Sequence, residues 1–355
     1  MKKYLFADSL KNHDEQNRGL LCFELDSATG ALTYRMTCDR DMPFPPYFII
    51  SKDQETLYCV SRNSASLDGQ PQSAVSSFHI NWEKNLLEFK NGAAVAGQGA
   101  CHLCLNEDET MLFVATFGTG TVFAFPVENG VIGQESSRLE PIAVKKFLSP
   151  EHYAADDRQA RSHFVQYVPE LKRLFYCDHG LDCVEICRLD ENKKLVLDDV
   201  ISFPKGSSPR HLVFDQALDY CYVLAEKSSE LYAVELGEKY KIVDGISMLP
   251  ADFEGSTKAA AIKLGGGYIM GSNRGHDSIF FAKFDKTSKK LSGHGWASSL
   301  GQVPRDFELT ADGKFMVIAN QDSDDLQMFS VDGNKLTKLN EAALGGCVCV
   351  KIIER

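Results

Sequence analysis

The chain has 355 residues, 44% of them hydrophobic, which is enough for a large folded core. The formal net charge of -11 argues against nucleic acid or an anionic membrane as a general partner. Eleven cysteines, an odd number without a framework spacing, indicate reduced thiols. The start "MKKYLFADS" has too short an apolar run for a signal peptide, and no other stretch approaches membrane-spanning length. We therefore expect a cytoplasmic protein.

Short runs rich in Val, Phe, Tyr, Ile and Leu follow one another along the chain. Each is bounded by Gly, Pro, Asp, Asn or Ser, which is the pattern of β-strands joined by tight turns. The clearest runs lie at 56–61, 111–116, 173–178, 219–226, 268–273 and 314–320. No linker or low-complexity segment interrupts the pattern, so we expect a single all-β domain over residues 1–355.

The runs belong to an internal repeat. Aligned copies of a strand, a turn and a returning strand occupy 45–63, 100–120, 161–182, 209–229, 259–278 and 304–324. Two further strand-like segments follow each copy, as in "TGTVFAFPVENGVI". Each unit therefore contains four strands, which is the size of one propeller blade.

The two ends of the chain supply one more blade. The N-terminal segment "KKYLFADS … GLLCFELDSATGALTYR" holds three strands, and "GGCVCVKII" at the C-terminus is a strand with nothing after it. Joining them removes two exposed sheet edges and closes a ring. The prediction is a seven-bladed β-propeller with four-stranded blades, closed by the C-terminal strand. The interval from His102 to His163 is longer than those between later copies, which places an insertion in the third unit.

The repeat also predicts which residues meet at one end of the blades. Tyr47 stands at the start of a first strand and Arg62 at the end of the second strand. The same number of residues separates the corresponding positions in other copies, and we call this separation the repeat step. Both positions therefore lie at the same end of the blade. Other pairs related by the repeat step are His102 and Phe117, His163 and Asp178, His211 and Glu226, and Asp306 and Gln321. If the usual blade order holds, all lie on the two innermost strands.

These equivalent positions in the aligned copies are expected to place polar and charged side chains around one axial mouth. The candidate site residues are His102, His163, Asp178, Arg210, His211, Glu226, Arg274, Arg305 and Gln321. A guanidinium near an axial channel requires an anion, from the protein or from a ligand. We therefore expect a small anionic substrate. A structural role is at least as good an interpretation for Asp178 and Gln321, and a salt bridge of the arginines to Glu226 is the alternative to a ligand site.

Two segments look like metal or cofactor motifs, but neither fits such a site. In "CHLC", strand alternation turns Cys101 and His102 to opposite faces, and no second cysteine pair has zinc spacing. The glycines at 265–267 lie in a hairpin turn and do not precede a helix, so a phosphate-cradling loop is not expected. We expect no metal and no organic cofactor.

Several segments together resemble the seven-bladed-propeller lactonases. This family includes one type of 6-phosphogluconolactonase and the fungal carboxy-cis,cis-muconate cyclase. The matching segments are "SHFVQYVPELKRLFYCDHGLD", "SPRHLVFD … YVLAE", "SNRGHDSI", "PRDFELTADGKFMVIANQDSD" and "GCVCVKI". They occur in family order over nearly the whole chain.

The resemblance implies that His163, Arg210, Glu226 and Arg274 are the catalytic and substrate-orienting residues. The chain departs from the family at Arg161-Ser162, where a proline and a histidine are usual, and at Thr116 to Gly120, where Asn-Tyr-Gly-Ser-Gly is usual. His179 replaces a leucine. We expect Arg161 and His179 to reshape the anion site.

The activity that the resemblance implies is hydrolysis of a phosphorylated sugar lactone. Glu226 or His163 would activate water, and Arg274 or Arg210 would stabilise the oxyanion. The remaining arginines, with His211, would hold a phosphate or carboxylate. Cycloisomerisation of a carboxylated muconate and a non-catalytic binding propeller are the alternatives. The sequence leaves the oligomeric state open.

Overall fold

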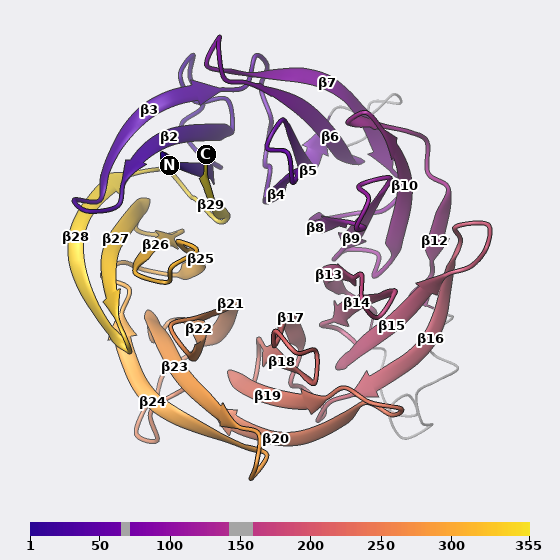
Figure 1. Cartoon of the computed structure of the whole chain (residues 1–355), viewed down its shortest axis with the longest axis vertical. Helices are drawn as coiled ribbons and strands as arrows, with labels where there is room; N and C mark the ends of the chain where they lie inside the picture. The colour runs from indigo at the N-terminus through magenta and orange to yellow at the C-terminus, as the bar shows by residue number, and fades with distance from the viewer. Residues whose placement is uncertain (65–71, 142–158) are drawn as a thin grey trace. The chain divides into compact units, whose positions relative to one another are not determined.

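The computed structural model describes residues 1–64, 72–141 and 159–355. All the named elements of these residues are strands, and they form seven antiparallel sheets (Figure 1). Most of the expected insertion, at 142–158, lies outside the described residues. None of the described segments forms a helix long and apolar enough to span a membrane.

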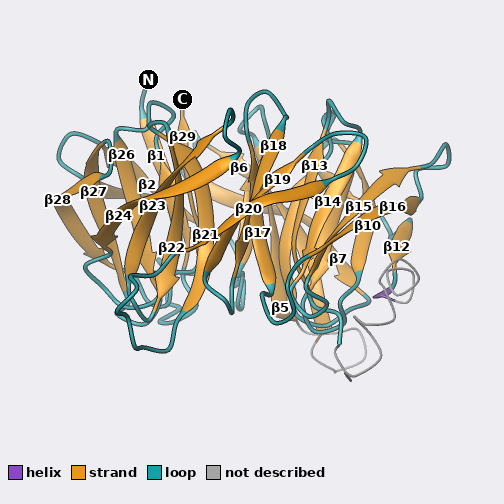
Figure 2. Ribbon diagram, turned by 90° about the horizontal axis from the view of Figure 1, so that it is seen from below, coloured by secondary structure: helices purple, strands orange, loops and turns teal. Residues whose placement is uncertain are grey.

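Contacts divide the described chain into two compact units. Unit 1 comprises Met1–Asn12, Leu21–Arg35 and Arg210–Arg355. Unit 2 comprises His13–Leu20 and Met36–Pro209. Figure 2 shows that turns and loops lie at the two ends of the strands in both units.

Unit 1 contains four sheets of four strands, three of which are meanders of consecutive strands. The first has the order β29 (Val350–Glu354), β1 (Lys3–Asp8), β2 (Leu20–Asp26), β3 (Ala31–Thr37). The others are β17 (Pro209–Phe214), β18 (Tyr220–Ala225), β19 (Glu230–Glu235), β20 (Lys241–Ser247); β21 (Lys258–Gly265), β22 (Tyr268–Arg274), β23 (Ser278–Asp285), β24 (Lys290–Ser298); and β25 (Pro304–Leu309), β26 (Phe315–Asn320), β27 (Asp325–Asp332), β28 (Lys335–Ala343).

The pairing of β29 with β1 confirms the predicted union of the two chain ends. The strands are antiparallel, with Leu5 opposite Ile352 and Ala7 opposite Val350. Figure 1 shows the N- and C-terminal labels beside each other at this sheet. The partnership covers an edge of β1 that would otherwise be open to pairing with another chain.

Unit 2 contains the three remaining sheets. Two are four-stranded meanders: β4 (Tyr47–Ile50), β5 (Thr56–Ser64), β6 (Gln72–Asn81), β7 (Leu86–Val95); and β13 (Ser162–Val168), β14 (Arg173–Asp178), β15 (Cys183–Leu189), β16 (Leu195–Ser202). The third comprises β8 (Ala100–Leu105), β9 (Met111–Thr116), β10 (Val122–Glu128), β11 (Val131–Ile132) and β12 (Ser137–Leu139).

In this third sheet the outer strand is broken into β11 and β12, and both pieces pair with β10. The break coincides with a turn in which the N–H of Gly133 donates to the carbonyl of Pro126 (2.8 Å). Pro126 of β10 has no N–H to donate to a neighbouring strand, so β11 and β12 pair with β10 on either side of this residue. The other six sheets have the four strands that the repeat predicts.

Consecutive sheets pack face to face within each unit. One cluster in unit 1 joins Tyr222 and Leu224 of β18 to Phe280 of β23. In unit 2, Tyr58 and Val60 of β5 share a cluster with Phe123 of β10, which is why alternate apolar residues recur on the inner strands. All eleven cysteines are free, in agreement with the expected reduced thiols, and ten of them are buried, where they act as small core residues.

A β-bulge recurs at the start of the first strands. The strand register shifts between Ala100 and His102, between Ser162 and Phe164, and between Pro304 and Asp306. A fourth shift lies between Ala259 and Ile262. Each bulge re-aims the side chains beside it, among them His163 and Arg305.

The bulges change one of the predicted pairs of equivalent positions, the pair of His163 and Asp178. Asp178 is the last residue of β14 and pairs with Ser162, just as Asn320 pairs with Pro304. His179, which follows Asp178, therefore occupies the position equivalent to Gln321. His163 lies in the bulge itself, so the repeat step counted from it ends one position too early.

Candidate functional site

Glu226 lies at the centre of a group of charged side chains in unit 1. Its Oε2 is 3.0 Å from Nε of Arg210, and its Oε1 is 3.1 Å from Nη2 of Arg274. The exposed fractions of the side chains are 4% for Arg210, 11% for Arg274 and 13% for Glu226. The structure thus brings together three of the four residues that the resemblance assigned.

Backbone carbonyls hold the same two guanidinium groups. Nη1 of Arg210 donates to the carbonyl of Ala260 (2.5 Å). Arg274 donates from Nη2 to the carbonyl of Ala259 (3.0 Å) and from Nε to that of Lys258 (3.3 Å). These three consecutive residues begin β21. In the preceding copy, Arg210 and His211 stand at the positions of Ala260 and Ala261, and this loss of polar side chains was visible in the sequence.

His211 and Arg305 extend the group. Nη1 of Arg210 lies 3.2 Å from Nε2 of His211, and since a guanidinium can only donate, His211 accepts here and carries its proton on Nδ1. Nη1 of Arg305 donates to Oε1 of Gln321 (3.3 Å), so a neutral amide orients this guanidinium. Asp306 is buried, and its Oδ2 accepts the N–H of Val350 (3.1 Å).

The group carries an excess of positive charge. Burial lowers the pKa of Arg210 to about 9, and the positive charges of Arg274 and Arg305 act in the same direction. The negative charges of Glu226 and Asp306 oppose this effect. Arg210 stays protonated at neutral pH, so three guanidinium groups accompany two carboxylates. Such an arrangement can bind an anion or stabilise a developing negative charge.

A second group, in unit 2, contains His163 and His179. Both are buried, with the ring of Phe117 5.7 Å from His163 and 5.3 Å from His179. The guanidinium of Arg161 lies 5.0 Å from the centre of the Phe117 ring. The departures from the family at Arg161, Phe117 and His179 are therefore in contact with one another.

His102 is packed as a core residue in unit 2. Its ring stacks on Tyr47 at 3.8 Å between ring centres and lies 4.4 Å from that of Phe164. Its Nδ1 accepts the N–H of Val165 (3.4 Å), which places the proton on Nε2. It is 3% exposed. These contacts fix the ring and its tautomer.

Asp178 caps a turn in unit 2. Its Oδ1 accepts three backbone N–H groups, from Arg161 (2.9 Å), Gly180 (2.8 Å) and Leu181 (2.9 Å). Burial raises the pKa of Asp178 to about 6, and these three hydrogen bonds act against that rise. The contacts correspond to the structural interpretation of this residue.

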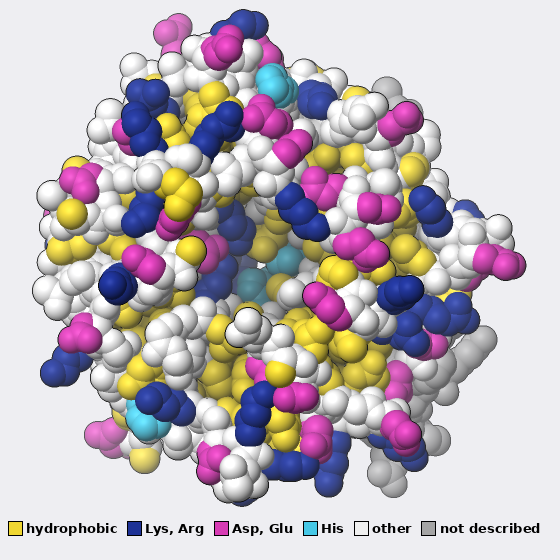
Figure 3. Space-filling model, viewed as in Figure 1, with side chains coloured by type: hydrophobic (Ala, Val, Ile, Leu, Met, Phe, Trp, Pro, Cys, Tyr) yellow, Lys and Arg dark blue, Asp and Glu magenta, His cyan; other side chains and the backbone are white. Residues whose placement is uncertain are grey.

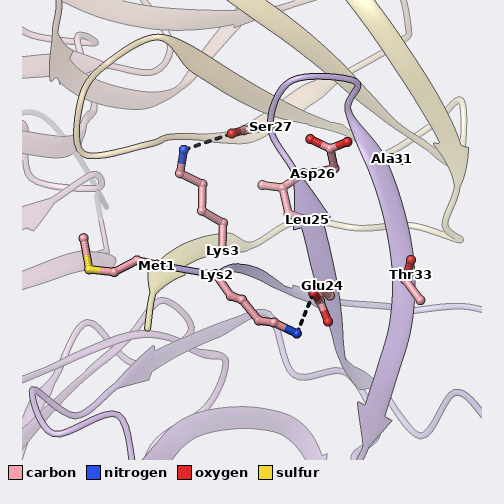
Figure 4. Close-up of a pocket in the computed structure, with 9 residues that line it drawn as sticks. All are labelled: Met1, Lys2, Lys3, Glu24, Leu25, Asp26, Ser27, Ala31 and Thr33. Carbon is pink, nitrogen blue, oxygen red and sulfur yellow. Dashed lines mark hydrogen bonds and ion pairs between the residues drawn. The ribbon is translucent and has the colours of Figure 1, made fainter.

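The described residues include other surface features without predicted site residues. One pocket of about 350 Å³ in unit 1 lies beside the N-terminus (Figure 4). Its cations are engaged, since Lys2 pairs with Glu24 (2.9 Å) and Lys3 donates to Ser27 (2.9 Å). Acidic and basic side chains are interspersed over the face in Figure 3. Within the described ranges, no group of three or more His, Cys, Asp or Glu residues could hold a metal ion.

Comparison with known proteins identifies the family. A family model described as "Lactonase, 7-bladed beta-propeller" matches residues 9–352. The chain belongs to this lactonase family. Its seven sheets are accordingly the blades of a seven-bladed β-propeller, as the repeat predicted.

One curated protein and two solved structures resemble the chain over nearly its full length. A 6-phosphogluconolactonase of Bacillus subtilis (strain 168) is 26% identical over 347 residues, covering 96% of this chain and 95% of that protein. A putative 6-phosphogluconolactonase of Bacteroides fragilis has a TM-score of 0.84 at 23% identity, covering 99% and 98% of the two chains. The periplasmic gluconolactonase PpgL of Pseudomonas aeruginosa has a TM-score of 0.86 at 22% identity, covering 99% of each. The two structures share the fold.

Proposed function

We propose that this lactonase-family protein hydrolyses a phosphorylated sugar lactone, with 6-phosphogluconolactone as the substrate and 6-phosphogluconate as the product. The observation that carries the proposal is the group of Arg210, Glu226 and Arg274, a net cationic arrangement in an acidic protein. The similarity to the Bacillus subtilis enzyme supports the choice of substrate.

The chemistry assigned to the site is attack of water on the lactone carbonyl. The water oxygen bonds to the carbonyl carbon, a base takes one water proton, and the carbonyl oxygen becomes an oxyanion. Collapse breaks the bond to the ring oxygen, which receives a proton and becomes the product hydroxyl. Arg274 and Arg210 stabilise the oxyanion. Glu226 and His163 are the two candidate bases from the sequence.

The remaining cations are assigned to the substrate phosphate. Arg305, oriented by Gln321, supplies a guanidinium suited to phosphate oxygens. His211 contributes an imidazole that Arg210 keeps in one tautomer.

Cytoplasmic location remains part of the proposal, supported by eleven free cysteines.

The test is an assay of 6-phosphogluconolactone hydrolysis against its spontaneous rate, with glucono-δ-lactone as the substrate that lacks phosphate. We expect a higher kcat/KM for the phosphorylated lactone and a loss of at least about tenfold in Arg274→Ala. Wild-type protein that does not exceed the spontaneous rate would refute the function. Activity that Arg274→Ala leaves intact would refute the site.

A further inference from the structure

We propose that Glu226 is a positioning residue. It holds Arg210 and Arg274 as one cationic pair, and it is not the base that takes a proton from water. The inference rests on the proposed lactone hydrolysis and decides which of the two candidate bases the site excludes.

The carboxylate is engaged at both oxygens, and by different arginines. Oε2 is 3.0 Å from Nε of Arg210 and Oε1 is 3.1 Å from Nη2 of Arg274. Each guanidinium thus has its own carboxylate oxygen. With the Glu226 side chain 13% exposed, little of it faces solvent.

The same three side chains are tied to the start of β21. The carbonyls of Lys258, Ala259 and Ala260 accept hydrogen bonds from the two guanidinium groups. The carbonyl of Glu226 accepts the N–H of Ala259 (3.0 Å). The pair is therefore held by backbone on one side and by the carboxylate on the other, and both guanidinium groups are oriented before a ligand binds.

Protonation of Glu226 would conflict with this arrangement. A neutral carboxyl must place its O–H hydrogen on one of the two oxygens, and each of these faces a guanidinium that can only donate. It would also leave Arg210 and Arg274 without their shared counter-charge, in a buried place where Arg305 adds further repulsion. A general base must accept a proton during each turnover, so these contacts work against that role.

Two terminal nitrogens complete the argument. Nη1 of Arg210 and Nη2 of Arg274 donate to backbone carbonyls, and each guanidinium has a second terminal nitrogen, Nη2 in Arg210 and Nη1 in Arg274. We assign these two nitrogens as the donors to a lactone oxyanion or to a substrate anion. In this arrangement Glu226 acts through the arginines, and the proton is taken by another group.

The experiment compares wild type with Glu226→Gln, using kcat and KM across pH and the Kd of 6-phosphogluconate by calorimetry. A positioning role predicts at least about tenfold weaker product binding and lower kcat/KM, because the Gln amide opposes one arginine. The pH midpoint of kcat/KM stays where it is in wild type. Glu235→Gln, which removes the half-buried ion-pair partner of Lys289 at the end of β19, is the matched control and should change neither.

The opposite pattern would overturn the inference. A base predicts that Glu226→Gln loses about 10²–10⁴ in kcat, loses the pH midpoint, and binds product as wild type does. If Glu226→Gln does not fold, the charge-balanced pair Glu226→Gln/Arg274→Gln is compared with Arg274→Gln. Equal kcat/KM and pH midpoints support positioning, whereas disappearance of the midpoint in the pair contradicts it.

The proposed function fails separately. Wild type without hydrolysis above the spontaneous rate refutes that function, and binding of 6-phosphogluconate then decides the inference alone. Weaker binding in Glu226→Gln supports it, and equal binding overturns it. Wild type that neither hydrolyses the lactone nor binds the product overturns both.

Discussion

The carboxylate of Asp8 accepts the backbone N–H of Cys349, near the other end of the chain, at 2.7 Å. The same oxygen, Oδ1, accepts the N–H of Val348 at 2.8 Å. Asp8 is fully buried, and burial raises its pKa to about 7 against the effect of these hydrogen bonds. The junction of the two chain ends therefore contains a carboxyl that titrates near neutral pH.

This junction makes stability depend on pH. Because the folded pKa of Asp8 is raised, folding favours its neutral form. That contribution is complete below the unfolded-state pKa of about 3.9 and is lost as pH rises through about 7. Asp8→Asn keeps an oxygen acceptor and cannot ionise. We expect its melting temperature, relative to wild type, to rise between pH 5 and pH 8.

The comparison with wild type isolates Asp8, since the buried Asp178 and Glu185 titrate in both proteins. Thermal melting at several pH values is the measurement. A difference in melting temperature that stays constant from pH 5 to pH 8 would show that Asp8 does not titrate in this range.

Removal of residues 350–355 tests the strand pairing at the same junction. The truncation deletes β29, leaves β1 with an open edge, and exposes Leu5 and Ala7, which share a hydrophobic cluster with the deleted Val350. We expect loss of cooperative thermal unfolding and a tendency to aggregate. Far-UV circular dichroism and light scattering measure both. A truncated chain that melts like wild type would mean that β29 contributes little to stability.

The repeat was sufficient to predict the sheets because each copy carries its own alternation of buried and exposed residues. The pairing of β29 with β1 followed from counting strands, since two partial blades complete one another. The broken outer strand at β11 and β12 was not predicted. Outer strands are half-exposed, so their sequences constrain the pairing less than those of inner strands do.

The candidate site was predicted unevenly, and the bulges explain why. The repeat step located Gln321 because Asp306, from which the step is counted, pairs with Ala319 beyond the bulge. The step failed for His163, which lies within one, and so Asp178 was taken for the position of His179. The hydrogen bonds to the carbonyls of Ala259 and Ala260 could not be predicted, because an alignment of side chains over the copies does not show backbone contacts.

Asp178 offers a test of structural against functional importance. Asp178→Ala leaves the N–H groups of Arg161, Gly180 and Leu181 without their acceptor in a buried turn. We expect a loss of about 3 kcal/mol or more in the free energy of unfolding, because each buried unsatisfied group costs about 1–3 kcal/mol.

Asp178→Asn, in contrast, retains an oxygen at the Oδ1 position and should cost less than about 1 kcal/mol. Urea denaturation of both variants measures the difference. Equal destabilisation by Ala and Asn would indicate that the charge of Asp178, and not its acceptor oxygen, supports the turn. A loss of kcat in Asp178→Asn without any loss of stability would restore the substrate-binding interpretation.

Arg210→Lys tests whether the geometry of the guanidinium matters beyond its charge. The arginine contacts Glu226 from Nε, and it contacts His211 and the carbonyl of Ala260 from Nη1, and one ammonium group cannot reproduce that planar arrangement. We expect kcat/KM for 6-phosphogluconolactone to fall by about 10²-fold, at unchanged net charge. Arg138→Lys, at an exposed ion pair with Glu135, is the control and should behave as wild type. Because charge is conserved in both variants, retention of wild-type kcat/KM in Arg210→Lys would mean that the site uses positive charge alone, and the shared orientation of Arg210 and Arg274 by Glu226 would have no part in catalysis.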